Sequence, residues 1–418
     1  MTLRRFSLAA GLGVALVAAA CNDEQLFPPA VPQYTGGAMF QRYVSMGNSL
    51  TAGFQSGGIN DSTQIRAYPV LVAAAMGGDL FYRPSLGTIP AAGIYGCPPP
   101  IDTLFTATGV PHRMGGGSAT TCGLRSLPAP PYISNVAVPG AAVVDPFHTG
   151  PTPTSNPLTL LILGGRSQVQ AMQAVQPTFV SVWIGNNDVL GAATNDVNAG
   201  NPDSVTPVAL FQARYDSMLA AIDATPSIRG GILIGVGDVA VIPYFSYGQF
   251  YFGAKLAGQL PAQMTVLANC APTSSGGIGD TVLVPFPYGF TLIATAQAGQ
   301  PTTLDCGDDH NIEPAELANL HATVAAYNTF ISARATSRGW AYLDPNVALA
   351  ALRADTSQVK PFPNTTATSC NGSASGNPFG KAFSCDGIHP STATHRLIAQ
   401  TLVQVINAKY SSAIPAVP

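Results

Sequence analysis

Five short apolar runs that alternate with helix-like segments constrain the fold of this chain more than any other feature. The clearest run is 178–184, which is nearly all apolar or β-branched, as a strand buried on both faces would be. Similar runs lie at 41–46, 133–138, 232–236 and 340–343. Strands that alternate with helices favour a parallel sheet with helices on both sides. We therefore expect an α/β fold, a three-layer α/β/α sandwich with a mainly parallel sheet of about five strands.

The helix-like segments between these runs support the same fold. They are expected near 68–76, 166–175 and 211–224, and a strong helix opens at Glu313-Pro314. In that last helix, apolar residues recur at spacings of three and four, proline stands at its start and Gly339 lies just past its end. A C-terminal helix follows the last loop. In such folds ligands bind at the carboxyl ends of the strands.

Short polar turns follow several of the predicted strands. They are Gly47–Ser49, Gly140, Gly185–Asp188 and Gly237–Asp238. Each of them has a plain structural interpretation as a turn or a helix cap. Because the strands end at one edge of the sheet, however, the turns are expected to cluster there, and the cluster is more informative than any single turn.

One of these turns presents a serine, and the end of the chain offers it a base. Ser49 is a poor nucleophile unless a base takes its proton. His389 is the candidate base, because Asp386 stands three residues before it and can orient the ring. Backbone N–H groups of Ser49 and Gly140 and the side-chain amide of Asn187 are candidate donors to an oxyanion.

Together these stretches resemble the sequence blocks of the SGNH hydrolases, also called GDSL esterases/lipases. The matching residues are Gly47-Asn48-Ser49-Leu50, Gly140, Gly185-Asn186-Asn187-Asp188 and Asp386-Gly387-Ile388-His389. Their order agrees with the family, and they bracket nearly the whole chain from about 41 to 408. One departure is Asn48, where the family name has aspartate; this position shapes the turn and carries no proton.

The resemblance implies a flavodoxin-like α/β/α sandwich and ester hydrolysis without a metal or another cofactor. It implies that Ser49 is the nucleophile, that His389 is the base and that Asp386 is its partner. It also implies an oxyanion hole made by Ser49, Gly140 and Asn187.

The first residues indicate export. Arg4 and Arg5 precede an apolar stretch from about residue 8 to 20, which is too short to span a bilayer as a mature helix. Cys21 follows small residues and resembles the lipobox of bacterial lipoproteins, although Ala18 stands where leucine is commoner. We expect a signal peptide at 1–20, a lipidated Cys21 that anchors the protein to a membrane of the bacterial cell envelope, and a tether at 21–38. The alternative is an ordinary secretory signal.

An even number of cysteines remains when Cys21 is set aside, which suggests disulfides in an exported chain. Loop closure favours near neighbours. The expected pairs are Cys97 with Cys122, Cys270 with Cys306, and Cys370 with Cys385. No Cys-x-x-Cys pair or Cys/His cluster indicates a zinc site.

Long segments rich in glycine and proline interrupt the strand–helix pattern. We expect one SGNH hydrolase domain over 39–410, with insertions near 77–131, 244–312 and 345–385. Aromatic residues at 244–252 and 286–290 either line an acyl site or pack within the insertion.

Charge excludes one class of partner. The chain of 418 residues has a net charge of −3 and no basic run, so nothing points to nucleic acid. The expected partners are an ester substrate, such as a lipid, an acylated small molecule or a polysaccharide, and a membrane through the lipid anchor. Two alternatives stay open: a carbohydrate esterase that removes acetyl groups, and a non-catalytic envelope lipoprotein that keeps the fold for binding.

Overall fold

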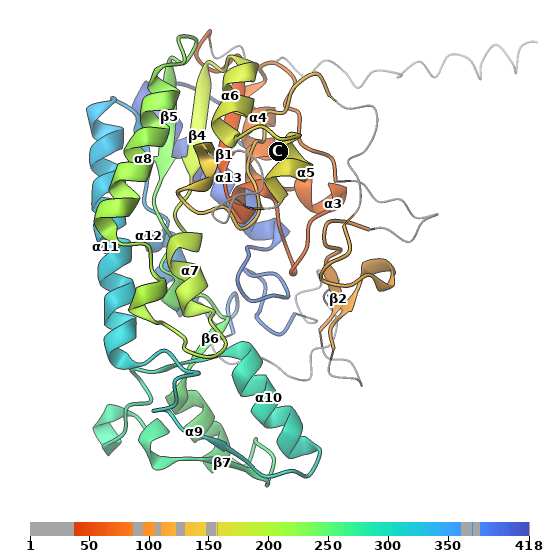
Figure 1. Ribbon diagram of the computed structural model, residues 1–418, viewed down its shortest axis with the longest axis vertical. Coiled ribbons are helices and arrows are strands. Elements are labelled where there is room, and N and C mark those ends of the chain that lie inside the picture. Colours follow the sequence, from red (N-terminus) through yellow and green to blue (C-terminus); the bar gives the residue numbers. More distant parts are fainter. Residues whose placement is uncertain are drawn as a thin grey trace, which may run out of the picture.

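A parallel sheet in the order β1-β4-β5-β10 forms the centre of the computed structural model (Figure 1). The structure describes residues 37–86, 95–104, 110–122, 130–147, 156, 158–360, 370 and 377–417. The sheet strands are β1 (Tyr43–Gly47), β4 (Phe179–Trp183), β5 (Gly230–Ile234) and β10 (Ala341–Leu343). The predicted signal peptide, Cys21 and all but the end of the tether lie outside the described residues.

The predicted strand at 133–138 forms an extended edge segment instead of a full strand. It pairs with β1 through an isolated parallel bridge between Asn135 and Ser45. Val136 N–H donates to Ser45 O at 2.9 Å and Val138 N–H donates to Gly47 O at 3.1 Å. The Asn135 side chain is itself engaged, since its amide donates to the carbonyl of Thr51. With this segment counted second along the chain, the spatial order is 2-1-3-4-5, which is the flavodoxin-like order.

Helices cover both faces of the sheet, as the alternating pattern predicts (Figure 1). The helices α4 (Tyr68–Met76) and α13 (Thr392–Tyr410) pack on one face. The helices α6 (Gln168–Val175), α8 (Val208–Asp223) and α11 (Pro314–Ser337) pack on the other. The three-layer α/β/α fold is therefore confirmed.

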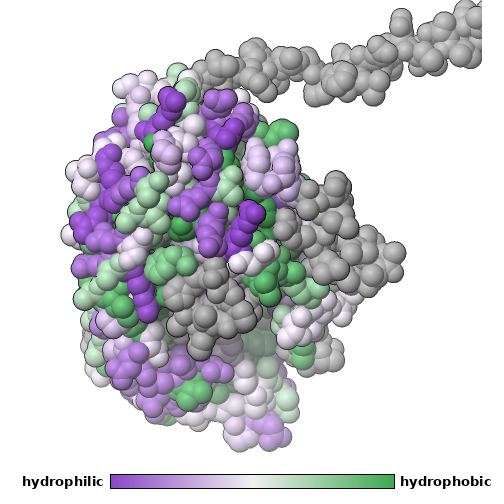
Figure 2. All heavy atoms as spheres, turned by 45° about the horizontal axis from the view of Figure 1, so that its top comes forward, coloured by the Kyte–Doolittle hydropathy of each residue, from purple (hydrophilic) through white to green (hydrophobic). Residues whose placement is uncertain are grey.

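The side chains of each central strand alternate between the two hydrophobic cores, one on each face of the sheet. In β4, Phe179 and Trp183 belong to the core beneath α4 and α13, whereas Val180 and Val182 belong to the opposite core. Successive side chains of a strand point to opposite faces, so an apolar run such as this one fills two layers at once. The outer faces of the helices are more polar, and Figure 2 shows hydrophilic residues interspersed with hydrophobic ones on one side of the molecule.

Shorter elements lie outside the central sheet and the five helices that cover it. They are α2 (Ser49–Ala52), α3 (Asp61–Gln64), α5 (Leu158–Leu163), α7 (Asn187–Ala193), α12 (Asn346–Ala354), β2 (Ile101–Thr103) and β3 (His112–Arg113).

The segment at 244–312 has secondary structure and a core of its own, where the sequence indicated only a long excursion (Figure 1, lower end). Two small sheets and two helices build it: β6 (Phe245–Tyr247) with β8 (Leu283–Pro285), β7 (Met264–Val266) with β9 (Thr302–Leu304), α9 (Gly248–Leu256) and α10 (Phe286–Gln297). Its pattern was missed because three-residue strands are too short to show a period.

Three disulfides join Cys97 to Cys122, Cys270 to Cys306, and Cys370 to Cys385. These are the pairs expected from loop closure. Disulfides persist in oxidising compartments, so they indicate an exported protein. Among the described helices, none has both the length and the apolar character needed to cross a membrane.

Removing the Cys270–Cys306 disulfide should destabilise the segment at 244–312, because the bridge closes a loop across a sequence separation of 36. In the chain-entropy description, a disulfide that closes a loop of this length stabilises the folded state by about 3 to 5 kcal/mol. We expect the Cys270→Ala/Cys306→Ala variant to be cleaved within 244–312 at protease concentrations that leave the wild type intact. The wild type with its three disulfides intact, treated with the same protease, is the control. Equal protection of the variant and the wild type would contradict the prediction.

Candidate active site

The turn that carries Ser49 is shaped by a glycine. Gly47 ends β1 with φ +158°, and a Cβ at this position would collide with the Thr51 side chain and the Trp183 carbonyl. Asn48 then caps α2, since its side-chain oxygen accepts a hydrogen bond from Leu50 N–H at 3.1 Å. Ser49 is therefore the first residue of α2, where a backbone N–H has no acceptor within the helix.

Gln168 holds this turn from the neighbouring helix. Its Nε2 donates to Gly47 O at 3.0 Å, and its Oε1 accepts from Gly47 N–H at 2.9 Å. Both partners are buried, so the paired bonds fix the end of β1 in one position. No local sequence signal marked Gln168, because a glutamine on an apolar helix face reads as a neutral helix residue.

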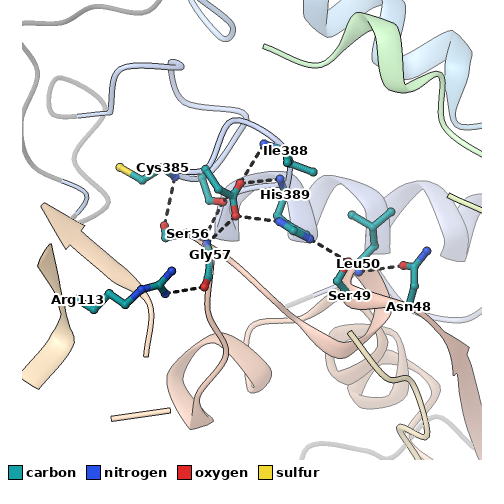
Figure 3. Close-up of polar contacts among 11 residues, drawn as sticks. Asn48, Ser49, Leu50, Ser56, Gly57, Arg113, Cys385, Ile388 and His389 are labelled. Carbon is teal, nitrogen blue, oxygen red and sulfur yellow. Dashed lines mark hydrogen bonds and ion pairs between the residues drawn. The ribbon is translucent and has the colours of Figure 1, made fainter. Parts of the chain in front are cut away.

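The structure brings Ser49, His389 and Asp386 together, and Figure 3 shows the His389 ring pointing toward Ser49. His389 Nε2 lies 2.9 Å from Ser49 Oγ, and His389 Nδ1 lies 2.8 Å from Asp386 Oδ2. An ionised carboxylate can only accept, so Nδ1 carries the ring proton and Nε2 accepts from the serine hydroxyl. Ser49 and His389 are 7% and 8% exposed, which leaves each within reach of a ligand while mostly shielding the contact from water.

Asp386 stays ionised although it is buried. Burial raises the pKa of this carboxyl, but the nearby His389 and a set of hydrogen bonds lower it by more, so the pKa lies well below its usual range. Oδ1 accepts from the Ser384 hydroxyl at 3.0 Å and from the backbone N–H groups of Ile388 and His389, each at 2.9 Å. Oδ2 accepts from Gly57 N–H at 2.7 Å in addition to His389.

An arginine supports this carboxylate through Gly57 (Figure 3). Arg113 Nη1 donates to Gly57 O at 2.7 Å and to Pro99 O at 2.6 Å. Burial lowers the pKa of Arg113, and the charge of Asp386 opposes that shift. Arg113 belongs to β3, which lies within 77–131, so this segment reaches the site. Sequence reasoning missed Arg113, because nothing local links it to a residue so far along the chain.

A second connection joins the loop after α2 to the loop before α13. Ser384 Oγ accepts from Ser56 N–H at 2.8 Å, and Ser56 Oγ accepts from Cys385 N–H at 3.2 Å. Cys385 is also joined to Cys370. The segment that holds Asp386 is thus tied down on both sides.

Of the predicted oxyanion residues Asn187 and Gly140, only Asn187 lines the pocket beside Ser49. Asn187, the first residue of α7, lines the same pocket as Ser49, and its side-chain amide donates to Ala141 O at 2.8 Å. Gly140 lies beside Ala141 in an exposed turn with φ +80°. It is not among the residues that line the pocket, so the structure connects Gly140 to the site through the Asn187–Ala141 bond.

A pocket of about 140 Å³ opens beside Ser49 and His389. Most of its lining is aliphatic. None of the aromatic residues at 244–252 and 286–290 lines it. Phe245 and Tyr251 are instead fully buried in cores, which favours the packing interpretation of that aromatic stretch.

A second histidine lies near the site but is held neutral. His395 in α13 is fully buried, and its Nδ1 accepts from Tyr68 N–H at 3.3 Å. Burial and the proximity of His389 lower the pKa of His395 to about 3. It therefore adds no positive charge beside His389 at neutral pH. Within the described part of the chain, no group of three or more His, Cys, Asp or Glu residues could hold a metal ion.

No family model matches the chain, and no curated protein matches it. Among solved structures, it is similar to an acetylxylan esterase from Geobacillus stearothermophilus at 12% identity and a TM-score of 0.33, over 88% of this chain and 94% of that one. It is similar to an extracellular lipase from Streptomyces rimosus at 13% identity and a TM-score of 0.38, over 88% and 98%. A further similar structure is LAE5, an alpha/beta hydrolase from the metagenome of Lake Arreo, at 14% identity and a TM-score of 0.37, over 89% and 99%. Because the identities and TM-scores of these three similarities are low, the function proposed below rests on the geometry of the site.

The buried carboxyl of Asp188, the residue after Asn187, makes stability depend on pH. Its Oδ2 accepts from Val143 N–H at 2.8 Å, and burial raises its pKa to about 6 against the lowering effect of that bond. A raised pKa in the folded state means that stability is lost as the pH rises from about 4 to above 6, because the folded protein must then hold a buried charge.

We expect Asp188→Asn to remove this loss, since asparagine keeps an acceptor for Val143 and never ionises. The variant should be more stable than the wild type at pH 7.5 by about 1 to 3 kcal/mol, and the difference should shrink below pH 4. Denaturant unfolding at several pH values measures it. A stability difference that does not change with pH would contradict the assignment.

Proposed function

We propose that this chain is a serine ester hydrolase of the SGNH type, formed by a single domain over 39–410. The observation that carries the proposal is the hydrogen-bonded series Ser49–His389–Asp386 at one end of an apolar pocket. A hydroxyl, an imidazole and an ionised carboxylate in this order are the parts that nucleophilic acyl transfer requires.

In the proposed first step, His389 Nε2 takes the proton of Ser49 as its Oγ attacks the ester carbonyl carbon. Asp386 holds the ring in the tautomer that leaves Nε2 free and stabilises the imidazolium that forms. His389 then gives the proton to the alcohol oxygen as the carbon–oxygen bond breaks, which leaves an acyl group on Ser49.

The negative charge on the carbonyl oxygen needs donors. We assign this role to the backbone N–H groups of Ser49 and Gly140 and to the Asn187 amide, which has a second N–H beyond the one bonded to Ala141. In the second step, His389 activates a water molecule that attacks the acyl carbon. The acid leaves and Ser49 regains its proton.

The polarity of the pocket favours one of the alternative substrate classes. A carbohydrate acetyl esterase needs polar groups to hold sugar hydroxyls, whereas this pocket is largely aliphatic. A lipase or an esterase acting on apolar acyl esters is therefore the favoured class, and acetyl removal from carbohydrate is the second candidate. A binding protein without activity would have no need of a buried base in contact with a serine.

We further propose that the protein is held in the bacterial envelope by lipid on Cys21, after removal of a signal peptide at 1–20. The lipobox-like sequence and the disulfides of an exported protein support this placement. A tether at 21–38 would keep the domain close to membrane lipids.

Ser49→Ala should lower kcat for a short p-nitrophenyl ester by about 10⁴-fold or more, because it removes the attacking atom. The fold should persist, which far-ultraviolet circular dichroism checks. Ser217→Ala, on the exposed face of α8, is the matched control and should keep full activity. Turnover retained by Ser49→Ala, or its labelling by a fluorophosphonate probe, would overturn the assignment.

Arg113→Met should lower kcat by about tenfold to a hundredfold with little change in KM, since it releases Gly57 from its place beneath Asp386 without touching the substrate. We expect Arg113→Lys to restore part of kcat, because one charged donor can still reach a carbonyl. Steady-state kinetics on the same ester measures both effects. A rise in KM at constant kcat, or equal losses in both variants, would count against a positioning role.

A further inference from the structure

We propose that the pocket beside Ser49 binds an aliphatic chain of about six carbon atoms that belongs to the ester substrate. This inference rests on the proposed function and names the substrate class for the same site. It also gives a role to α12, which lies in the segment expected as the 345–385 insertion.

The pocket has a reactive end and an apolar body. Ser49, Asn187 and His389 lie among its lining residues. The body is formed by aliphatic side chains from several elements: Leu190 of α7, Val239 and Ile242 after β5, Leu343 of β10, Leu349 and Leu352 of α12, and Leu397 and Ile398 of α13. Such a lining removes a hydrocarbon from water and offers few partners to a sugar hydroxyl.

One face of helix α12 forms a wall of the pocket. Leu349 and Leu352 line the pocket and are partly buried, whereas Val347 is 76% exposed and does not line it. Asn346 fixes the start of the helix, since its Nδ2 donates to Val236 O at 3.0 Å and its Oδ1 accepts from Asp238 N–H at 2.7 Å. The wall is therefore attached to the end of β5 and is ready formed before a ligand enters.

Asp238 is the one carboxylate among the lining residues, and its presence does not make the pocket unsuited to a hydrocarbon. Asp238 lines the pocket, but its carboxylate is occupied by His321 Nδ1 at 2.7 Å and by Ala240 N–H at 3.0 Å. Because these partners satisfy the carboxylate, it does not require a polar substrate group.

The volume sets the length of the chain. An engineered apolar cavity of about 150 Å³ in another protein holds benzene, so a pocket of about 140 Å³ suits a group of about six carbons. An acetyl group would fill only the reactive end and would leave most of the apolar lining uncovered. The hydrocarbon can come from the acyl side or the alcohol side of the ester, since both meet at the carbonyl carbon that Ser49 attacks.

Two series of esters measure the preference and separate these sources. In the acyl series, p-nitrophenyl hexanoate is compared with p-nitrophenyl acetate; in the alcohol series, hexyl acetate is compared with ethyl acetate. We expect kcat/KM to favour the six-carbon member by about tenfold to a hundredfold in one series, because each buried methylene adds a few-fold. A ratio near one in both series would overturn the proposal while leaving ester hydrolysis intact.

A matched pair of variants on α12 tests the location. Leu349→Gln introduces an amide into the pocket, and Val347→Gln introduces the same group on the exposed side of the same helix. The six-carbon preference should fall by about tenfold in Leu349→Gln and stay unchanged in Val347→Gln. An equal six-carbon preference in the two variants would show that the hydrocarbon binds elsewhere.

A binding measurement keeps the pocket testable without turnover. Trp183 lines the pocket, so a brominated chain bound there should quench its fluorescence. In Ser49→Ala, we expect 6-bromohexan-1-ol to quench saturably and 2-bromoethanol to quench only in proportion to its concentration. Saturable quenching together with a wild-type protein that hydrolyses no ester would reject the proposed function and keep the pocket. Proportional quenching by both probes would reject the pocket.

Discussion

The buried carboxylate of Asp386 is the interaction on which the site depends. It is the acceptor at which three distant parts of the chain meet: the loop after α2 through Gly57, the loop before α13 through His389, and, behind Gly57, the arginine of β3. A buried charge is tolerated only when hydrogen bonds and opposite charge replace its water. Holding Asp386 ionised therefore requires that all these segments be in place, and the same arrangement fixes the direction of the His389 ring.

The three segments that the sequence predicted as insertions all contact the site. The first supplies Arg113, and the third supplies α12 and the Cys370–Cys385 bridge next to Asp386. The segment at 244–312 also reaches the site, since Tyr244 N–H donates to Gly387 O at 3.0 Å. These segments lie outside the parallel sheet and contribute to what lies at its carboxyl edge.

Much of the fold follows from periodicity. The buried strands β4 and β5, the helices α4 and α11 and the positions of Ser49, Asp386 and His389 were all readable, because each signal is local: a run of β-branched residues, a helical spacing or a turn after a strand. The edge segment at 133–138 and the small sheets of 244–312 were not, because the pairing of such short stretches is decided by neighbours from elsewhere in the chain. Asn135 shows such long-range contacts, since its backbone forms a bridge to Ser45 of β1 and its side chain bonds the carbonyl of Thr51.

The sequence by itself predicted the layered α/β architecture, the favoured disulfide pairs and the candidate site residues, since these predictions rest on local pattern, on loop length or on residue type. Only the tertiary structure decided that Ser49 and His389 lie 2.9 Å apart, that Gln168 and Arg113 support the site, and that α12 and α13 enclose an aliphatic pocket. Those contacts join residues that are far apart along the chain. Their geometry is set by how the layers pack, and no local propensity encodes it.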